Sequence, residues 1–191
     1  MKKGFKDGMA AILLVAAITI VSVISNRDAQ SESEGPTQPI FFSHKIHAGE
    51  NQIPCEYCHS YVAVSAKPGI PSVQKCMGCH THIPGKDELY EDGPEKINFQ
   101  TEINKLKDYW DKKTPIPWVK VHYVAEHARF KHKPHIKRGI ECSACHGEVE
   151  NMHVVKRVKK IEMGWCITCH EDNAKDEKEL ERLKDCLTCH Y

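Results

Sequence analysis

The segment Cys166-Ile-Thr-Cys169-His170 is one of five copies of a short pattern, in which two cysteines separated by two residues are followed at once by a histidine. The pattern uses all 10 cysteines of the 191-residue chain. Because Cys-x-x-Cys-His is the attachment pattern of c-type haem, the sequence predicts five covalently bound haem c groups. We number the copies motif 1 to motif 5 in chain order: Cys55/Cys58/His59, Cys76/Cys79/His80, Cys142/Cys145/His146, Cys166/Cys169/His170 and Cys186/Cys189/His190.

The order of residues within each motif suits one porphyrin. The two thiols each bond one vinyl group, and the adjacent imidazole becomes the proximal ligand of the iron. Five disulfides or a set of zinc sites would also account for the cysteines. Neither explains why a histidine follows the second cysteine of every pair, so haem attachment is the interpretation we favour.

The composition leaves little material for a conventional core. The chain is 40% hydrophobic and only 7% aromatic, and part of that hydrophobic total lies in one run from Met9 to Ile24. Stacked macrocycles would supply the missing apolar surface. We therefore expect a mostly irregular and α-helical multihaem cytochrome c fold, organised around its haems. Lysine and arginine number 27 against 26 acidic residues, so no polyanion-binding face is implied and nucleic acid is not an expected partner.

Repeated histidine pairs indicate the distal ligands. Of 13 histidines, five follow the cysteine pairs and eight remain for the sixth positions of five irons. The segment Phe42-Ser-His44-Lys-Ile-His47 precedes motif 1 much as Phe130-Lys-His132-Lys-Pro-His135 precedes motif 3. Repetition ahead of a haem motif favours ligation over a solvated surface, so we predict these four histidines as distal ligands.

The second half of the chain, with one such histidine pair and three motifs, resembles the class III cytochromes of the c7 and c3 type. The resemblance implies that the first histidine of a pair ligates the next haem, the second a later one, and a histidine between motifs the last. It assigns His132 to motif 3, His135 to motif 4 and His153 to motif 5. By analogy, His44 is assigned to motif 1 and His47 to motif 2.

The fifth distal ligand has alternatives. Met152 stands beside His153 and could ligate instead, which would raise the potential of that haem. His122, in the connection between the two halves, is a third candidate, although hydrogen bonding to a propionate or a surface position suits it equally well.

The N-terminus has the layout of a secretory signal or a signal anchor, because three lysines precede the apolar run and a polar segment follows it. The positive-inside rule then places everything after Ile24 outside the cytoplasm. The run is longer than most cleavable signals and shorter than most spanning helices. We expect an uncleaved transmembrane anchor in the cytoplasmic membrane, with the haem domain on its periplasmic face, and a cleaved signal as the alternative.

Motif spacing and composition divide the chain into five parts. The parts are an anchor at 1–25, a flexible linker at 26–39, a dihaem lobe at 40–96, a helical connector at 97–128 and a trihaem c7-like lobe at 129–191. The connector has four apolar residues at helical spacing, which predicts a short helix that ends before Pro115 and packs between the lobes. These residues are Phe99, Ile103, Leu106 and Trp110.

A second helix is predicted between motifs 4 and 5. The segment from Ala174 to Asp185 is highly charged, and Leu180 and Leu183 fall on one side of it.

Several longer segments are similar to the membrane-anchored pentahaem cytochrome c subunit of alternative complex III. The resemblance implies a subunit that passes electrons from a quinol-oxidising respiratory complex to a cytochrome c or a terminal oxidase. No catalytic residue is predicted, because the sequence holds no nucleophile with its base, no phosphate loop and no carboxylate pair in an apolar setting. The resemblance also implies as partners an iron-sulfur/molybdopterin-like subunit, polytopic quinol-binding subunits and a monohaem cytochrome c. The segments are 38–49, 53–59, 69–73, 76–80, 115–122, 130–135 and 163–170.

Two other functions compete with this one. A membrane-anchored tetrahaem quinol dehydrogenase, feeding a periplasmic reductase, has a methionine two residues after its first motif, whereas Ser60 and Tyr61 follow His59 here. A small multihaem reductase would need an iron with an open position. Enough histidines are present to make every iron six-coordinate, which favours electron transfer.

The cofactor load is directly measurable. Expressed with a c-haem maturation system, the chain should gain the mass of five haems, and these should survive denaturation because thioether links are covalent. Intact mass spectrometry measures this gain. A colourless product that carries zinc or disulfides would contradict the assignment.

Overall fold

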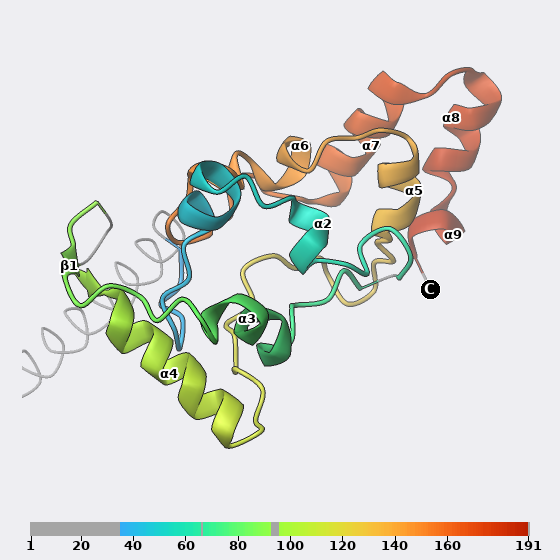
Figure 1. Cartoon of the computed structure of the whole chain (residues 1–191). Helices are drawn as coiled ribbons and strands as arrows, with labels where there is room; N and C mark the ends of the chain where they lie inside the picture. Colours follow the sequence, from blue (N-terminus) through green and yellow to red (C-terminus); the bar gives the residue numbers. More distant parts are fainter. Residues whose placement is uncertain (1–34, 66, 93–95, 191) are drawn as a thin grey trace, which may run out of the picture.

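The computed structural model describes residues 35–65, 67–92 and 96–190 (Figure 1). The predicted anchor at 1–25 and most of the predicted linker lie outside these residues. Within the part of the chain that is described, no helix has the length and apolar character that crossing a bilayer requires.

Short helices joined by irregular segments make up the described chain, as expected. The elements in chain order are the π-helix η1 (Lys45–Glu50), α2 (Cys55–Cys58), α3 (Val73–His80), β1 (Leu89–Tyr90), β2 (Ile97–Asn98), α4 (Phe99–Asp111), α5 (His132–Lys137), α6 (Ser143–His146), the 3-10 helix η2 (Val149–Asn151), α7 (Met163–Asn173), α8 (Glu177–Lys184) and α9 (Cys186–Cys189). The two strands pair antiparallel, with Leu89 opposite Asn98 and Tyr90 opposite Ile97.

Helix α4 confirms the helix predicted in the connector. It begins where the Asn98 side chain accepts a hydrogen bond from the Thr101 amide at 2.9 Å, and it ends before Pro115. Leu106 is buried as predicted, whereas Trp110 is 43% exposed. The helix packs along α3 (Figure 1) instead of between the lobes, so the prediction of a strut was wrong.

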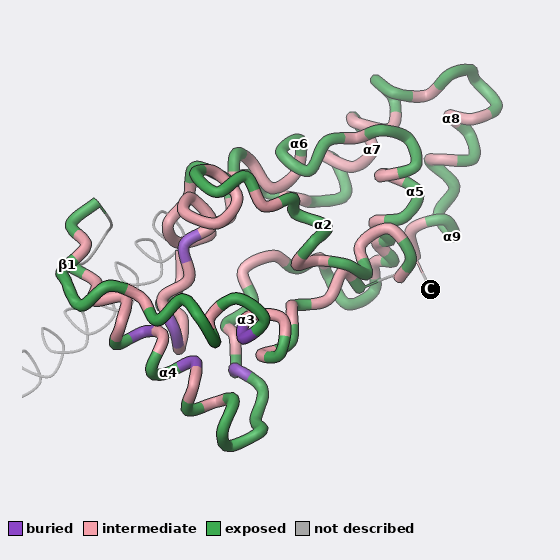
Figure 2. Tube along the Cα trace, in the orientation of Figure 1, coloured by how far each residue is buried: buried purple, intermediate pink, exposed green. Residues whose placement is uncertain are grey.

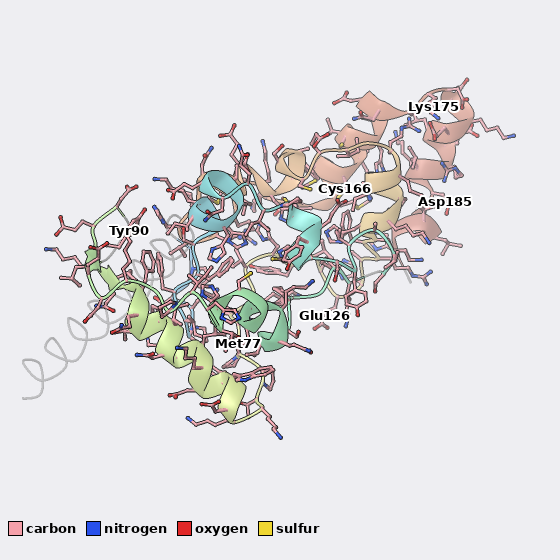
Figure 3. The ribbon with its side chains drawn as sticks, in the orientation of Figure 1. Met77, Tyr90, Glu126, Cys166, Lys175 and Asp185 are labelled. Carbon is pink, nitrogen blue, oxygen red and sulfur yellow. The ribbon has the colours of Figure 1, made fainter. Side chains whose placement is uncertain are left out.

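The apolar core of the described residues is small and lies at one end. It consists of Ile40, Met77, Leu106 and Ile116, with α3 and α4 on either side (Figures 2 and 3). The buried carboxylate of Glu102 accepts a hydrogen bond from the Phe41 amide at 2.8 Å. This bond ties α4 to the segment that leads into η1.

The C-terminal part of the described chain is held together by a helix cap and an ion pair and not by a buried apolar core. Helix α8 confirms the second predicted helix, with Leu180 and Leu183 half-buried, but it begins later than expected because the Asp176 carboxylate caps it through the Glu179 amide at 2.7 Å. The guanidinium of Arg138, just after α5, donates to both carboxylate oxygens of Glu179, at 3.0 and 3.2 Å. Such a bidentate pair fixes α8 against α5.

The core predicts a contrast between two positions on α4. Leu106→Ala should lower the free energy of unfolding by about 2–5 kcal/mol, because Leu106 is only 5% exposed. Trp110→Ala removes a larger but exposed side chain from the same helix and should cost less. Thermal unfolding of the haem-loaded variants measures both, and a greater loss for Trp110→Ala would contradict this description of the core.

Candidate functional site

All five motifs lie on short helices or at their ends. Motif 1 forms α2, motif 2 ends α3, motif 3 spans the start of α6, motif 4 lies within α7, and motif 5 forms α9. Residues three and four apart share one face of a helix. The local fold therefore presents two thiols and the imidazole that follows them toward the same side, as a covalently attached haem requires.

The two thiols of a motif are not equally exposed, although the sequence pattern made no distinction between them. Four cysteines are exposed, one in every motif except motif 4: Cys55, Cys79, Cys142 and Cys186. In motif 2 the exposed thiol is the second one, Cys79, because Cys76 packs against the apolar core beside α3. The described residues thus do not enclose Cys79, and a haem there would be held by its thioether bonds more than by burial. Attachment at Cys79 stays a prediction.

The two rival explanations of the cysteines find no support. All ten cysteines are free, so the disulfide scaffold is wrong. Among the described residues, no three or more histidine, cysteine, aspartate or glutamate side chains converge to hold a metal ion, as a structural zinc site would need.

Four proximal histidines are oriented by the backbone. A carbonyl oxygen can only accept, so each Nδ1 bonded to one carries the proton and leaves the Nε2 lone pair for a metal. Gly69, one of the acceptors, has φ +78°, a conformation that favours glycine. The bonds are His59 Nδ1 to Gly69 O at 2.9 Å, His80 to Ile83 O at 3.0 Å, His170 to Leu183 O at 3.1 Å and His190 to His127 O at 3.2 Å.

The repeated histidine segments fold alike. His47 and His135 each donate from Nδ1 to the carbonyl four residues earlier, at 2.8 and 2.9 Å. The phenylalanine of each segment lies edge-on to its first histidine, with ring centroids 4.9 Å apart in the Phe42 segment and 4.8 Å in the Phe130 segment. The similarity seen in the sequence is therefore a similarity of structure.

The structure brings three of the predicted distal histidines to their assigned partners. The ring centroids are 6.1 Å apart for His47 and His80, and 6.2 Å apart for both His132–His146 and His135–His170. An imidazole nitrogen bonds a metal at about 2 Å, and its ring centre lies about 1 Å farther out, so two axial imidazoles on one iron have centres about 6 Å apart. These three pairs have the spacing of axial ligands.

The fourth pair is supported by electrostatics. Burial lowers the pKa of His44 to about 4, and the neighbouring His59 and His47 add to the decrease. His44 thus lies within electrostatic reach of the proximal histidine of motif 1, to which it was assigned. Its ligation remains a prediction.

The fifth assignment is not supported. His153 lies against the first lobe, where its Nδ1 and the Ser43 hydroxyl are 2.9 Å apart. The Met152 carbonyl beside it accepts from the Lys45 amide at 2.9 Å. His190 instead contacts His127, with ring centroids 5.5 Å apart. The packing of η2 on η1 thus draws His153 and Met152 away from motif 5.

His122 does not serve motif 5 either. Its ring meets that of His146 edge-on with centroids 4.4 Å apart, so it lies at motif 3. Burial lowers the pKa of His122 to about 4, with His146 and Arg157 adding to the decrease. The spacing of residues in the sequence did not predict this contact. It also could not predict the backbone acceptors of the proximal histidines, because every residue has a carbonyl oxygen.

Four buried histidine nitrogens of the described residues have no hydrogen-bond partner: Nδ1 of His44 and His132, and Nε2 of His122 and His153. The first two belong to histidines predicted to be distal ligands, whereas His122 and His153 lie away from the haem to which each was a candidate ligand. The fit to covalent haem therefore rests on the thiols and the ring spacings. Bound haem would supply a one-electron Fe(II)/Fe(III) couple.

Two family models each match a part of the chain. Residues 128–191 match the family described as cytochrome c7 and related cytochrome c, and residues 21–102 match the class III cytochrome C family. These matches support a multihaem c-type cytochrome that transfers electrons.

A particular relative is similar over most of the chain. It is the "Menaquinone reductase, multiheme cytochrome c subunit" of Nitratidesulfovibrio vulgaris, 28% identical over 151 residues, which are 79% of this chain and 60% of the relative. The chain thus spans less than two thirds of that protein's length.

The position of His153 predicts a role distinct from ligation. His153→Ala should create no new high-spin signal and should change the spectrum of the haem at motif 2, because Ser43 contacts His153 through its hydroxyl and His47 through its carbonyl. Electron paramagnetic resonance of the oxidised protein measures both effects.

A matched variant shows how large a high-spin signal the loss of one distal ligand produces. His135→Ala removes a ring that faces a proximal histidine and should produce a high-spin signal. A high-spin signal of similar size from His153→Ala would show that His153 is a ligand.

Proposed function

We propose that this chain carries electrons through five covalent haem c groups, as a subunit of a quinol-oxidising respiratory complex of the alternative complex III type. The observation that carries the proposal is the spacing of the three histidine pairs, at 6.1–6.2 Å. An iron with an imidazole on both sides has no position left for a substrate. Such a site exchanges electrons and does no bond chemistry.

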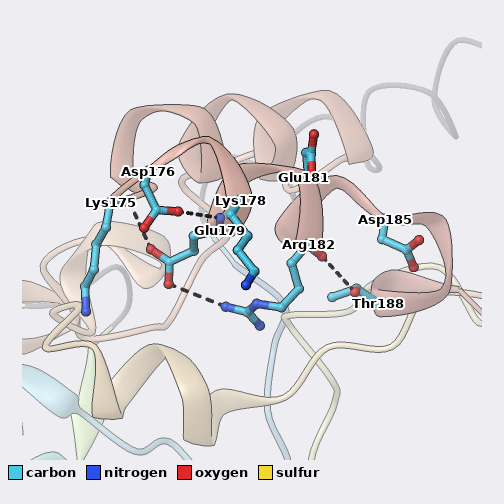
Figure 4. Close-up of a pocket in the computed structure, with 8 residues that line it drawn as sticks. All are labelled: Lys175, Asp176, Lys178, Glu179, Glu181, Arg182, Asp185 and Thr188. Carbon is cyan, nitrogen blue, oxygen red and sulfur yellow. Dashed lines mark hydrogen bonds and ion pairs between the residues drawn. The ribbon is translucent and has the colours of Figure 1, made fainter.

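One hollow in the described residues, of about 640 Å³, is lined largely by charged side chains of α8 and its flanks (Figure 4). There Glu179 accepts a hydrogen bond from the Lys175 amide at 2.9 Å and contacts Arg182 at 3.4 Å. These contacts stabilise the start of α8, so we assign the two side chains a structural role.

The partners follow from the class of complex. A quinol site belongs to polytopic membrane subunits, beside an iron-sulfur/molybdopterin-like subunit, and a monohaem cytochrome c or a terminal oxidase accepts the electrons. The haem domain would lie on the periplasmic face of the cytoplasmic membrane, held there by residues 1–25. The sequence resemblance to alternative complex III supports this arrangement, and a relative that is a subunit of a quinone-linked enzyme agrees with it.

A second candidate function is electron transfer in the opposite direction, toward the quinone. The relative is named as a subunit of a menaquinone reductase, in which electrons enter the quinone. The same haems serve either direction, because each iron both gains and loses one electron.

The intact membrane complex distinguishes the two functions. Anaerobic menaquinol should reduce its haems rapidly, seen as a rise of the α-band absorbance, and turnover with an oxidised cytochrome c should follow. The isolated chain should be reduced by dithionite but not by menaquinol, which is the matched control.

Two outcomes would contradict the proposal. Quinol oxidation by the isolated chain at the rate of the complex would place the quinol site on this chain. Faster turnover from a reduced cytochrome to menaquinone would establish the second candidate instead.

A further inference from the structure

The helix that presents the predicted distal histidines of the first lobe is too short to be stable on its own. His44 is the N-cap of η1, His47 lies within it, and the helix is six residues long. So short a helix forms too few hydrogen bonds to offset the cost of its first turn. Its stability must therefore come from contacts with other parts of the protein.

The main contacts of η1 come from the second lobe. Among the described elements, η1 packs chiefly on η2, which follows motif 3 in the chain. The first amides of a helix have no acceptor inside that helix. The Lys45 amide, in the first turn of η1, donates to the Met152 carbonyl just after η2, at 2.9 Å. A backbone group of the second lobe thus completes the start of the helix.

Gly49 allows the two elements to approach each other this closely. It lies in η1, and a Cβ at its position would overlap the Glu150 carbonyl oxygen of η2. A larger residue at Gly49 would therefore push η2 away from η1. A Cβ at Gly35 would likewise overlap the Val155 carbonyl oxygen. Residues 150 and 155 thus both lie in backbone contact with segments that precede motif 1.

His153 is inserted among side chains of the first lobe. Its side chain is only 12% exposed, and its ring centroid lies 6.2 Å from that of Phe41 and 5.5 Å from that of Tyr90. Its Nδ1 lies 2.9 Å from the hydroxyl of the buried Ser43. The Ser43 carbonyl accepts a hydrogen bond from His47 Nδ1 at 2.8 Å. The same serine thus contacts the second lobe with its side chain and the predicted motif 2 ligand with its backbone.

We propose that residues 150–155 form a clasp by which the second lobe positions the distal histidines of the first. The clasp lies between motifs 3 and 4 in the chain, and it holds η1 at the Lys45 amide, at Gly49 and at Ser43. His47 then takes up its final position only after the second lobe has docked. The proposal rests on ligation of the motif 2 haem by His47, which belongs to the proposed function.

Gly49→Ala tests the clasp in the haem-loaded chain. The added methyl group should part η1 from η2, so the Lys45 amide should exchange its hydrogen several-fold faster, as measured by mass spectrometry. The electron paramagnetic resonance signal of the motif 2 haem should shift or become high-spin, while those of motifs 3 and 4 stay. Gly164→Ala, on α7, is the matched control, because a Cβ there meets nothing within 4 Å, and it should change neither measurement.

Two further variants support the test. His47→Ala removes the predicted ligand, so the signal that it converts to high-spin identifies the motif 2 haem. If Gly49→Ala also loses the signals of the second lobe, His153→Ala replaces it, because that change empties the contact with Ser43 without adding an atom. It too should speed exchange at Lys45 and shift the motif 2 signal.

Two results would overturn the proposal. An unchanged motif 2 signal together with faster exchange at Lys45 would show that η1 holds His47 without the clasp. Equal exchange at Lys45 in Gly49→Ala and Gly164→Ala would show that η2 does not protect the start of η1. Failure of the proposed function has a different signature: His47→Ala would then give no new high-spin signal, and the proposal would fail with it.

Discussion

Coordination of each iron by two imidazoles, which we propose for this chain, is the constraint on which the arrangement of its histidines would depend. Each proximal ring is fixed by its motif and, in four of five cases, by a bond from Nδ1 to a backbone carbonyl. The distal ring must then arrive from another segment at a centre-to-centre distance of about 6 Å. The predicted distal histidines come from two elements of six residues each: His47 lies in η1, with His44 as its N-cap, and His132 and His135 lie in α5.

The same constraint explains why the two lobes are stabilised so differently. The buried apolar side chains of the described residues, Ile40, Met77, Leu106 and Ile116, all belong to the first lobe and its connector. The C-terminal segment instead leaves Leu187 73% exposed and relies on ion pairs such as Arg138–Glu179. If haem contacts replace a side-chain core there, folding of the second lobe should depend on cofactor attachment more strongly than folding of the first.

Local pattern was enough to predict the motifs, the repeated histidine segments and the helices around Leu106 and Leu183, because each is set by residues close in sequence. Tertiary placement was not predictable in the same way. The resemblance to class III cytochromes assigned His153 to motif 5, yet η2 packs on η1 and leaves it beside Ser43.

Two further residues show the same limit. Trp110 shares its helical face with Leu106 in the sequence, but α4 lies on α3, and Tyr109 packs against the core in its place. Cys79 has the same role as Cys76 in the motif, yet only Cys76 packs against that core, and Cys79 is exposed. The predicted anchor lies outside the described residues and stays a prediction.

Near-infrared magnetic circular dichroism of the fully oxidised, haem-loaded chain tests the central claim most directly, since it separates iron held by two histidines from iron held by histidine and methionine. The histidine pairs at motifs 2, 3 and 4, with His44 beside motif 1, predict that at least four of the five irons are of the first kind. A spectrum dominated by histidine–methionine or high-spin iron would contradict the account.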